Sequence, residues 1–319
     1  MKTFYWLVKR EFWEHRGGFF WAPVITGGVF LLLNLMGIIA GEVLGGHFDG
    51  TANFIGNNMR VLDNALDKEA VAKVGAGLDL MMYSTTMMIS IVLGFVVFFY
   101  CLGSLYDDRR DRSLLFWKSL PISDTATVLS KVVSATVVAP FIALVSGVLT
   151  GIVMLLMFAI ALSLHGVGVW HLLTLAHPFR VIVNLVGSIP LYFLWALPTV
   201  GWLMLCSAWA RSKPFLWAVV IPVAMGIGIG WFNLLGTLHV SNGHWAGWLA
   251  RILLSVFPGG WFNQIPNTIQ HSDLAGSLAG LDLNRTYMVL TTPDIWIGVL
   301  AAAAMLAGAI WLRRWRDDS

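Results

Sequence analysis

The densest run of ionisable side chains in this chain lies between Tyr106 and Lys131, and its residue types suit binding more than catalysis. Aspartates and arginines fill positions 107–112 and nearly cancel one another's charge. A short apolar turn, 114–117, follows and leads to Pro121. A solvated loop has little use for an exposed apolar turn, so the stretch predicts a surface that contacts something.

Helical spacing divides this stretch into two parts. Asp108 and Arg112 can pair at a spacing of four residues on a helix, and Pro121 ends that helix. Ser123 or Asp124 can then cap the helix that follows. The second part is an apolar knob made of Leu114, Phe116, Trp117 and Leu120.

Two interpretations of this helix remain open from the residues alone. A short helix with paired charges and an aromatic knob is suited to docking in a groove on a soluble partner. Alternatively, a neutralised helix could lie on the lipid headgroups, with Trp117 at the membrane interface.

Catalytic and metal-binding motifs are not evident elsewhere in the sequence. The chain has eight histidines, and seven of them fall in segments predicted on the outer side of a membrane. None belongs to an H-E-x-x-H motif or to a comparable pair with a carboxylate, so scattered polar surface is favoured over a metal site. No G-x-S-x-G nucleophile motif is present. We therefore predict that the chain is not an enzyme.

Nucleotide hydrolysis has its own requirement. A P-loop, G-x-x-x-x-G-K-[ST], uses glycine amides and a lysine to hold phosphates, and none of the lysines here follows a glycine. If transport is driven by ATP, the ATPase is another chain, and this chain binds no cofactor itself.

Ion-coupled carriers and channels usually place ionisable side chains inside their membrane spans. The apolar segments here hold mainly neutral polar residues, namely Thr26, Asn34, Ser90, Thr136 and Asn184. Hydrogen bonds between helices explain such residues, so a proton or sodium relay is poorly supported.

The composition of the chain is that of a membrane protein. Of the 319 residues 58% are hydrophobic and only 12% are charged, and the mean hydropathy is +0.76, which is typical of an all-α integral membrane protein. Runs of about 20 apolar residues cross the bilayer as helices. Cys101 and Cys206 fall inside such runs and are expected to act as small hydrophobes. We predict six spans, at 19–40, 80–105, 128–162, 181–210, 214–236 and 292–312. The third is longer than the bilayer needs, so it must tilt, kink near Pro140 or project into water.

Six spans place both chain ends on one side, and the basic residues identify that side as cytoplasmic. Most lysines and arginines fall in the N-terminus, the 106–131 stretch, the 211–213 turn and the C-terminal tail, as the positive-inside rule requires. Residues 1–16 are predicted to form an amphipathic helix in the membrane interface, with Glu11 away from its apolar face. The chain is predicted to be one membrane domain, 1–319.

Three segments are predicted on the outer side. Residues 41–79 form a polar loop and 163–180 a shorter one, while 237–291 contains an apolar run, 248–257, that is too short to cross the bilayer. This run indicates a re-entrant segment that dips in from outside. This re-entrant segment and the turn that closes it contain the candidate residues Trp248, Phe257, Pro258, Gly259 and Trp261.

Two motifs resemble a known family. The segment LYDDRRDRSLLFWKSLPIS is similar to the loop after the second span in type 2 ABC exporter permeases, and VKREFWEHRGG resembles their amphipathic N-terminal helix. The predicted topology, with six spans, both ends inside and a re-entrant hairpin before the last span, resembles that family along the whole chain. The resemblance implies that 106–127 is a coupling region that inserts into a separate nucleotide-binding subunit.

The resemblance also implies partners and a function. The expected partners are an ATPase subunit that carries ATP and magnesium, a second copy of this chain or a related permease, and membrane lipid, with no nucleic acid. The expected function is export of a hydrophobic or amphipathic molecule (lipid-like, peptide or drug-like) across a bacterial inner membrane. A non-transport membrane scaffold and an ion-coupled secondary carrier are the alternatives. The expected ATPase contacts are Tyr106, Asp108, Arg109, Arg112, Leu114, Leu115, Phe116, Trp117, Leu120 and Pro121.

Overall fold

The structure, a computed structural model, describes residues 2–44, 68–110, 122–163, 176–235, 242–261 and 282–315. Every element in these ranges is helical, because a helix is the structure that satisfies its own backbone hydrogen bonds in hydrocarbon. Six segments are long and apolar enough to cross a membrane: Gly17–Gly41, Gly75–Arg110, Asp124–Ala161, Pro178–Trp209, Leu216–Asn233 and Pro293–Trp315. They match the six predicted spans to within a turn or two of helix, which confirms the all-helical class and fits a multi-pass membrane protein.

The elements follow one another as helices of very different length. In chain order they are α1 (Lys2–Glu14), η1 (Gly17–Trp21), α2 (Ala22–Leu44), α4 (Lys68–Arg110), α6 (Asp124–Val133), η2 (Ser134–Val138), α7 (Ala139–Ser163), α9 (Pro178–Trp209), η3 (Leu216–Val220), α10 (Ile221–Leu234), α11 (Asn242–Leu254), α13 (Leu283–Met288), η5 (Val289–Thr291) and α14 (Pro293–Trp315). With 43 residues α4 is about 65 Å long, so it extends well beyond a hydrocarbon core of about 30 Å.

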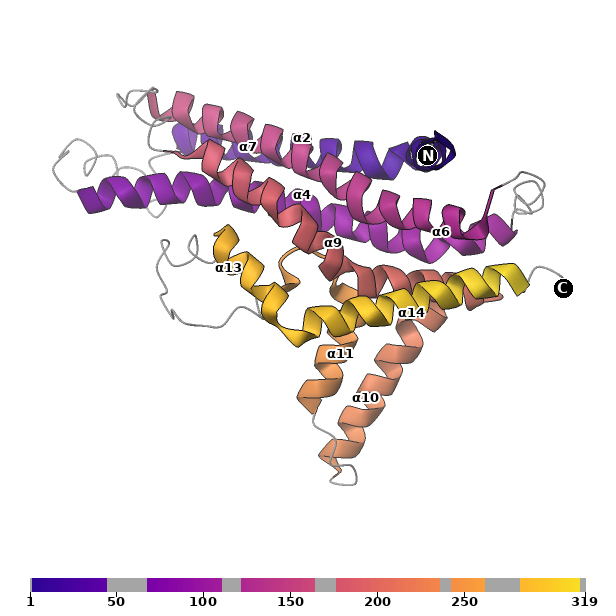
Figure 1. Ribbon diagram of the computed structural model, residues 1–319. Helices are drawn as coiled ribbons and strands as arrows, with labels where there is room; N and C mark the ends of the chain where they lie inside the picture. Colours follow the sequence, from indigo (N-terminus) through magenta and orange to yellow (C-terminus); the bar gives the residue numbers. More distant parts are fainter. Residues whose placement is uncertain are drawn as a thin grey trace.

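The centre of the bundle is α4, against which α2, α7 and α9 pack, while α14 runs along α9 (Figure 1). Val97 and Cys101 of α4 and Leu203 and Met204 of α9 are fully buried in the core between these helices. Cys101 and Cys206 are both free and buried, which confirms that they pack as small hydrophobes.

Two helices leave most of their apolar surface uncovered by the described part of the chain. Leu32 and Met36 on α2 are 61% and 66% exposed, and Ile227 and Trp231 on α10 are 69% and 63% exposed. The pair α10 and α11 also diverges from the other helices (Figure 1). Surfaces of this size and polarity need lipid or a second chain to cover them.

Three of the spans contain a wide helical turn, which opens the first and fifth spans and lies within the third. The turns η1, η2 and η3 are π-helical, and each ends two residues before a proline, namely Pro23, Pro140 and Pro222. In each, the residue before the proline donates its N–H to the carbonyl five residues earlier. A proline ring clashes with the carbonyl four residues before it, and the wider turn removes that clash. The predicted kink at Pro140 is therefore a π turn, whereas α9 continues through Pro190 and Pro198.

The close approach of α7 to α4 depends on Gly147. A methyl group added there would lie 2.7 Å from Cγ2 of Thr86 and 3.0 Å from its Cα. Because Cα belongs to the backbone, rotation of a side chain cannot relieve the contact. We expect Gly147→Ala to lower the free energy of unfolding by about 1–3 kcal/mol, as overpacking does elsewhere, measured by thermal unfolding in detergent.

Gly151, one turn further along α7, provides the matched control for this prediction. The same added methyl would meet Met82 at 3.6 Å, an ordinary contact. Gly151→Ala should therefore be neutral, or stabilise by up to about 1 kcal/mol through helix propensity. Equal losses of stability in the two variants would contradict the close approach at Gly147.

Candidate functional site

The predicted coupling region lies partly within the described structure. Tyr106, Asp108 and Arg109 occupy the last turns of α4, and α6 begins at Asp124. The remaining predicted ATPase contacts lie outside the described residues, and these are Arg112, Leu114, Leu115, Phe116, Trp117, Leu120 and Pro121. The structure therefore defines the two ends of the segment 111–121, and the candidate site is built from them.

A buried ion pair joins α1 to α6. The Glu11 side chain is 0% exposed and that of Lys131 is 2% exposed, and Lys131 Nζ lies 3.2 Å from Glu11 Oε1. Tyr100 of α4 donates a hydrogen bond of 2.9 Å to Oε2 of the same carboxylate. Burial raises the pKa of Glu11, but Lys131, Tyr100 and Arg10 more than offset it, so the pKa lies below its usual value. Glu11 is therefore a charged anchor for α1.

The prediction that Glu11 lies away from the apolar face of α1 is wrong. Glu11 is buried together with Leu7, which precedes it by one helical turn on the same face. A charge is tolerated there because Lys131 supplies the opposite charge inside the bundle.

A second set of ion pairs connects both ends of the segment 111–121. Lys131 Nζ also lies 3.5 Å from Oδ1 of Asp108. Arg313, near the end of α14, places Nη1 3.2 Å from Asp108 Oδ2 and Nε 3.2 Å from Asp124 Oδ1. Asp108 comes just before the segment and Asp124 just after it. One guanidinium group thus holds both ends of the segment.

The cap of α6 leaves Asp124 available for this role. The Ser123 hydroxyl accepts a hydrogen bond of 3.2 Å from the N–H of Ala126, which confirms one of the two predicted N-caps. Asp124 instead pairs with Arg313. We call Glu11, Asp108, Asp124, Lys131 and Arg313 the charge cluster.

Arg109 and Ser207 attach α4 to the end of α9. Arg109 Nη2 donates to the carbonyl oxygens of Ser207 at 2.6 Å and of Ala210 at 3.0 Å. The Ser207 hydroxyl accepts a hydrogen bond of 2.9 Å from the N–H of Tyr106. Carbonyls at a helix C-terminus lack partners within the helix, so Arg109 completes the end of α9. A contact between Arg109 and an ATPase stays a prediction.

The charge cluster is a mechanical connection between helices. It joins α1, α4, α6 and α14 at one end of the bundle, and Arg109 adds α9 (Figure 1). Removing one partner of a buried ion pair costs about 3–5 kcal/mol, so these helix ends are expected to move together. A force on the segment 111–121 would therefore reach five helices at once.

One group in the described part of the chain has the spacing of metal ligands. The ligand atoms of Glu11, Glu14 and His15 lie within 4.8 Å of one another. Arg10 already pairs with the two carboxylates, at 2.8 Å and 3.2 Å, and Lys131 pairs with Glu11 as well. These cations take the place that a metal ion would fill, so the group does not support a metal site.

Of the residues predicted in the re-entrant segment, Trp248 is exposed, whereas Phe257 and Trp261 pack against other helices. Trp248 lies on the exposed face of α11, with 56% of its surface free. Phe257 meets Phe95 of α4 edge to face, with ring centroids 4.8 Å apart. The turn that follows contains Pro258 and Gly259, and the φ of 86° at Gly259 is one that glycine adopts most easily.

The end of this turn is fixed to α9. Trp261 is 5% exposed and packs edge to face on Tyr192 and on Trp195, at 6.4 Å in each case. The guanidinium of Arg251, from α11, lies 3.4 Å from the ring centroid of Trp195, a cation–π contact. Sequence reasoning counted Arg251 only as an outer basic residue and so missed this contact.

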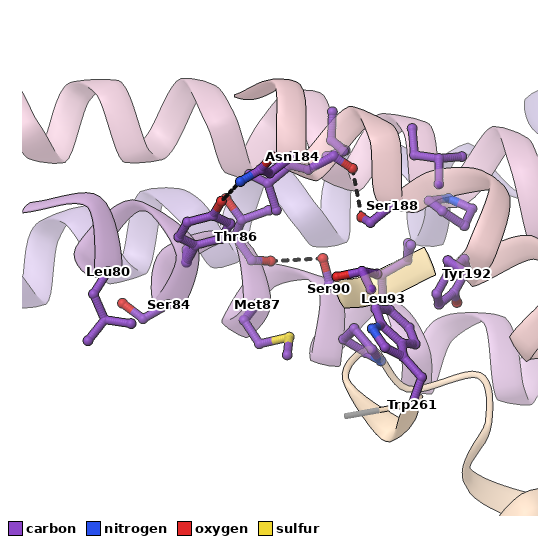
Figure 2. Close-up of a pocket in the computed structure, with 17 residues that line it drawn as sticks. Leu80, Ser84, Thr86, Met87, Ser90, Leu93, Asn184, Ser188, Tyr192 and Trp261 are labelled. Carbon is purple, nitrogen blue, oxygen red and sulfur yellow. Dashed lines mark hydrogen bonds between the residues drawn. The ribbon is translucent and has the colours of Figure 1, made fainter. Parts of the chain in front are cut away.

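A cavity of about 240 Å³ lies next to Trp261 (Figure 2). Residues 80–93 of α4 line it, whereas the charge cluster lies further along that helix, at Asp108. Its walls come from α4, α7, α9 and α13 and from the turn after α11. Its lining residues are Leu80, Tyr83, Ser84, Thr86, Met87, Ser90, Leu93, Pro140, Leu144, Asn184, Leu185, Ser188, Ile189, Tyr192, Pro258, Trp261 and Thr286.

Comparison of the chain with protein-family models, with curated proteins and with solved structures finds no match. The function is therefore argued from the geometry and chemistry of the charge cluster and the cavity.

Several residues of the charge cluster were not predicted as a site. Lys131 and Arg313 were interpreted only as basic flanks on the cytoplasmic side, and Tyr100 was taken as part of a span. The available indication was a glutamate, Glu11, at helical spacing from apolar residues of α1. Such a position demands a buried cation, but the sequence alone does not say which one.

Proposed function

We propose that this chain is the transmembrane permease subunit of an ATP-driven ABC exporter in a bacterial inner membrane. The segment 106–121 docks on a separate ATPase subunit, which holds ATP and magnesium. Two copies of the chain, or this chain and a related permease, form the transport path. The cargo is a hydrophobic or amphipathic molecule, and the chain itself catalyses no reaction.

The observation that carries this proposal is that Arg313 forms ion pairs with Asp108 and Asp124, which flank the segment 111–121 on its two sides. A loop that only covers the membrane surface does not need its two ends tied to a third helix through ion pairs with a buried arginine. A loop that transmits force needs such a connection, because a force applied to the loop must move α4 and α6 together. The uncovered apolar faces of α2 and α10 also support a partner within the membrane.

The proposal is tested by co-purification with a P-loop ATPase encoded next to this chain. Affinity purification of the wild-type permease should retain the ATPase. The double variant Phe116→Ala/Trp117→Ala should retain at least about tenfold less, because aromatic hot-spot residues each contribute about 2 kcal/mol or more to an interface.

A matched control removes the same two residue types at exposed positions outside the proposed docking region. Phe179 and Trp248 are 78% and 56% exposed, and Phe179→Ala/Trp248→Ala should retain the ATPase like the wild type. Equal retention by both double variants would show that 106–121 is not the docking element. Retention without ATP-dependent movement of any cargo in liposomes would favour a membrane scaffold instead.

A further inference from the structure

The cavity between α4, α7, α9 and α13 has walls with a consistent hydrogen-bonding character. Six hydroxyl-bearing residues line it besides Tyr83, and each donates its only hydroxyl proton to a backbone carbonyl, over distances of 2.7 to 3.0 Å. They are Ser84, Thr86, Ser90, Ser188, Tyr192 and Thr286. A hydroxyl whose proton is used in this way keeps free lone pairs. The cavity therefore presents mainly hydrogen-bond acceptors.

Tyr83 and Asn184 add a smaller donor element at the same site. The Tyr83 hydroxyl accepts a hydrogen bond of 2.9 Å from Nδ2 of Asn184 (Figure 2). Within the described part of the chain, its own proton has no acceptor, and Asn184 carries a second N–H. A hydroxyl group, which both donates and accepts, matches this combination of many acceptors and few donors.

The rest of the lining is apolar and uncharged. Leu80, Met87 and Leu144 supply aliphatic surface, and among the lining residues from the described ranges there is no Asp, Glu, Lys, Arg or His. A charged head group would lose hydration here without gaining a partner charge. A neutral molecule with an apolar body keeps its dispersion contacts and meets no such cost.

We propose that this cavity binds a neutral amphiphile, with a hydroxyl-bearing head group among the serine and tyrosine oxygens and an aliphatic chain against Leu80, Met87 and Leu144. The assignment of this molecule as cargo rests on the proposed function, whereas its binding does not. The chemical class is that of a monoacylglycerol or a long-chain alcohol.

The test uses the full chain in phosphatidylcholine nanodiscs, without nucleotide or ATPase. The probe is a monoacylglycerol with a diazirine in its acyl chain, cross-linked by light and mapped by mass spectrometry. Cross-links should fall in peptides that contain residues 80–93 and 184–192. Unlabelled monooleoylglycerol should compete at about tenfold lower concentration than methyl oleate, which has the same chain but no hydroxyl, because about two net hydrogen bonds are lost.

Two variants separate the cavity from the lipid-facing surface. Ser188→Phe fills the cavity and should reduce labelling of these peptides at least fivefold. Val186 lies two residues away and is 46% exposed. Val186→Phe therefore adds a phenylalanine outside the cavity, and it should leave labelling unchanged. Should Ser188→Phe fail to fold, Ser90→Ala/Ser188→Ala removes two acceptors with little change in volume, and it should abolish the preference for monooleoylglycerol.

Three results would overturn the proposal. One is labelling that is confined to lipid-exposed peptides of α2 and α10, another is equal labelling in Ser188→Phe and Val186→Phe, and the third is equal competition by methyl oleate. None of these outcomes bears on the co-purification experiment, because no ATPase is present. A failure of the cavity proposal is therefore distinguishable from a failure of the proposed function.

Discussion

Replacing Lys131 with methionine is expected to lower the free energy of unfolding by about 3–5 kcal/mol. Lys131 lies between the carboxylates of Glu11 and Asp108, at 3.2 Å and 3.5 Å. Its removal takes away the ammonium group that separates the two carboxylates and that, together with Arg10, balances the charge of the buried Glu11. Methionine preserves most of the side-chain volume, so the loss reports on charge. Thermal unfolding of the detergent-solubilised protein measures it.

The control for this prediction removes both charges of the pair. Glu11→Gln combined with Lys131→Met removes the charge of both members of the pair, and the double variant should recover much of the stability that Lys131→Met loses. If the single and double variants were equally destabilised, the loss would come from packing around Lys131, and the charge cluster would not be the connection described here.

Replacing Arg313 with methionine is expected to cost about 1.5–3 kcal/mol, the range for hydrogen bonds to charged groups. The change removes the bonds to Asp108 and Asp124 and so releases α14 from both ends of the segment 111–121. Arg313→Lys should recover only part of the lost free energy of unfolding, because a single ammonium group cannot reproduce the two separate N–H donors with which the guanidinium binds Asp108 and Asp124. Thermal unfolding in detergent again provides the measurement.

The adjacent residue supplies a matched control, since Arg313 is buried and Arg314 is exposed. Arg314→Met should change the free energy of unfolding by no more than about 0.5 kcal/mol. The proposed function further predicts that Arg313→Met keeps the complex with the ATPase but loses ATP-driven export, because the proposed docking residues are untouched. Equal effects of the two substitutions would contradict the bridging role of Arg313.

The sequence predicted the helices well because the membrane restricts the possibilities so strongly. An apolar run long enough to cross the bilayer has essentially one structure available, so the six long helices and the packing of Cys101 and Cys206 followed from composition. The cap at Ser123 followed from local chemistry. The position of residues 1–16 in the membrane interface, and the re-entrant course of 248–257, stay predictions.

The charge cluster was beyond sequence reasoning because it depends on contacts between distant residues. Glu11 and Lys131 are 120 positions apart, and the periodicity of α1 alone describes Glu11 as a polar residue among apolar ones. Arg313 and Asp108 are 205 positions apart, and charge counting assigned Arg313 only a side of the membrane. Helix periodicity predicts which face is polar, but the three-dimensional arrangement decides which charges meet.

The π turn before Pro140 has a geometric consequence for the third span. This wide turn contains one residue more than an α-helical turn, and one residue corresponds to a rotation of about 100° around the helix axis. In the third span α6 and α7 form one continuous helix through η2, so the residues after Ser134–Val138 are out of phase with those before it. A helical wheel drawn continuously through this turn assigns residues of α6 and α7 to the wrong faces, and the wheel must be restarted at Pro140.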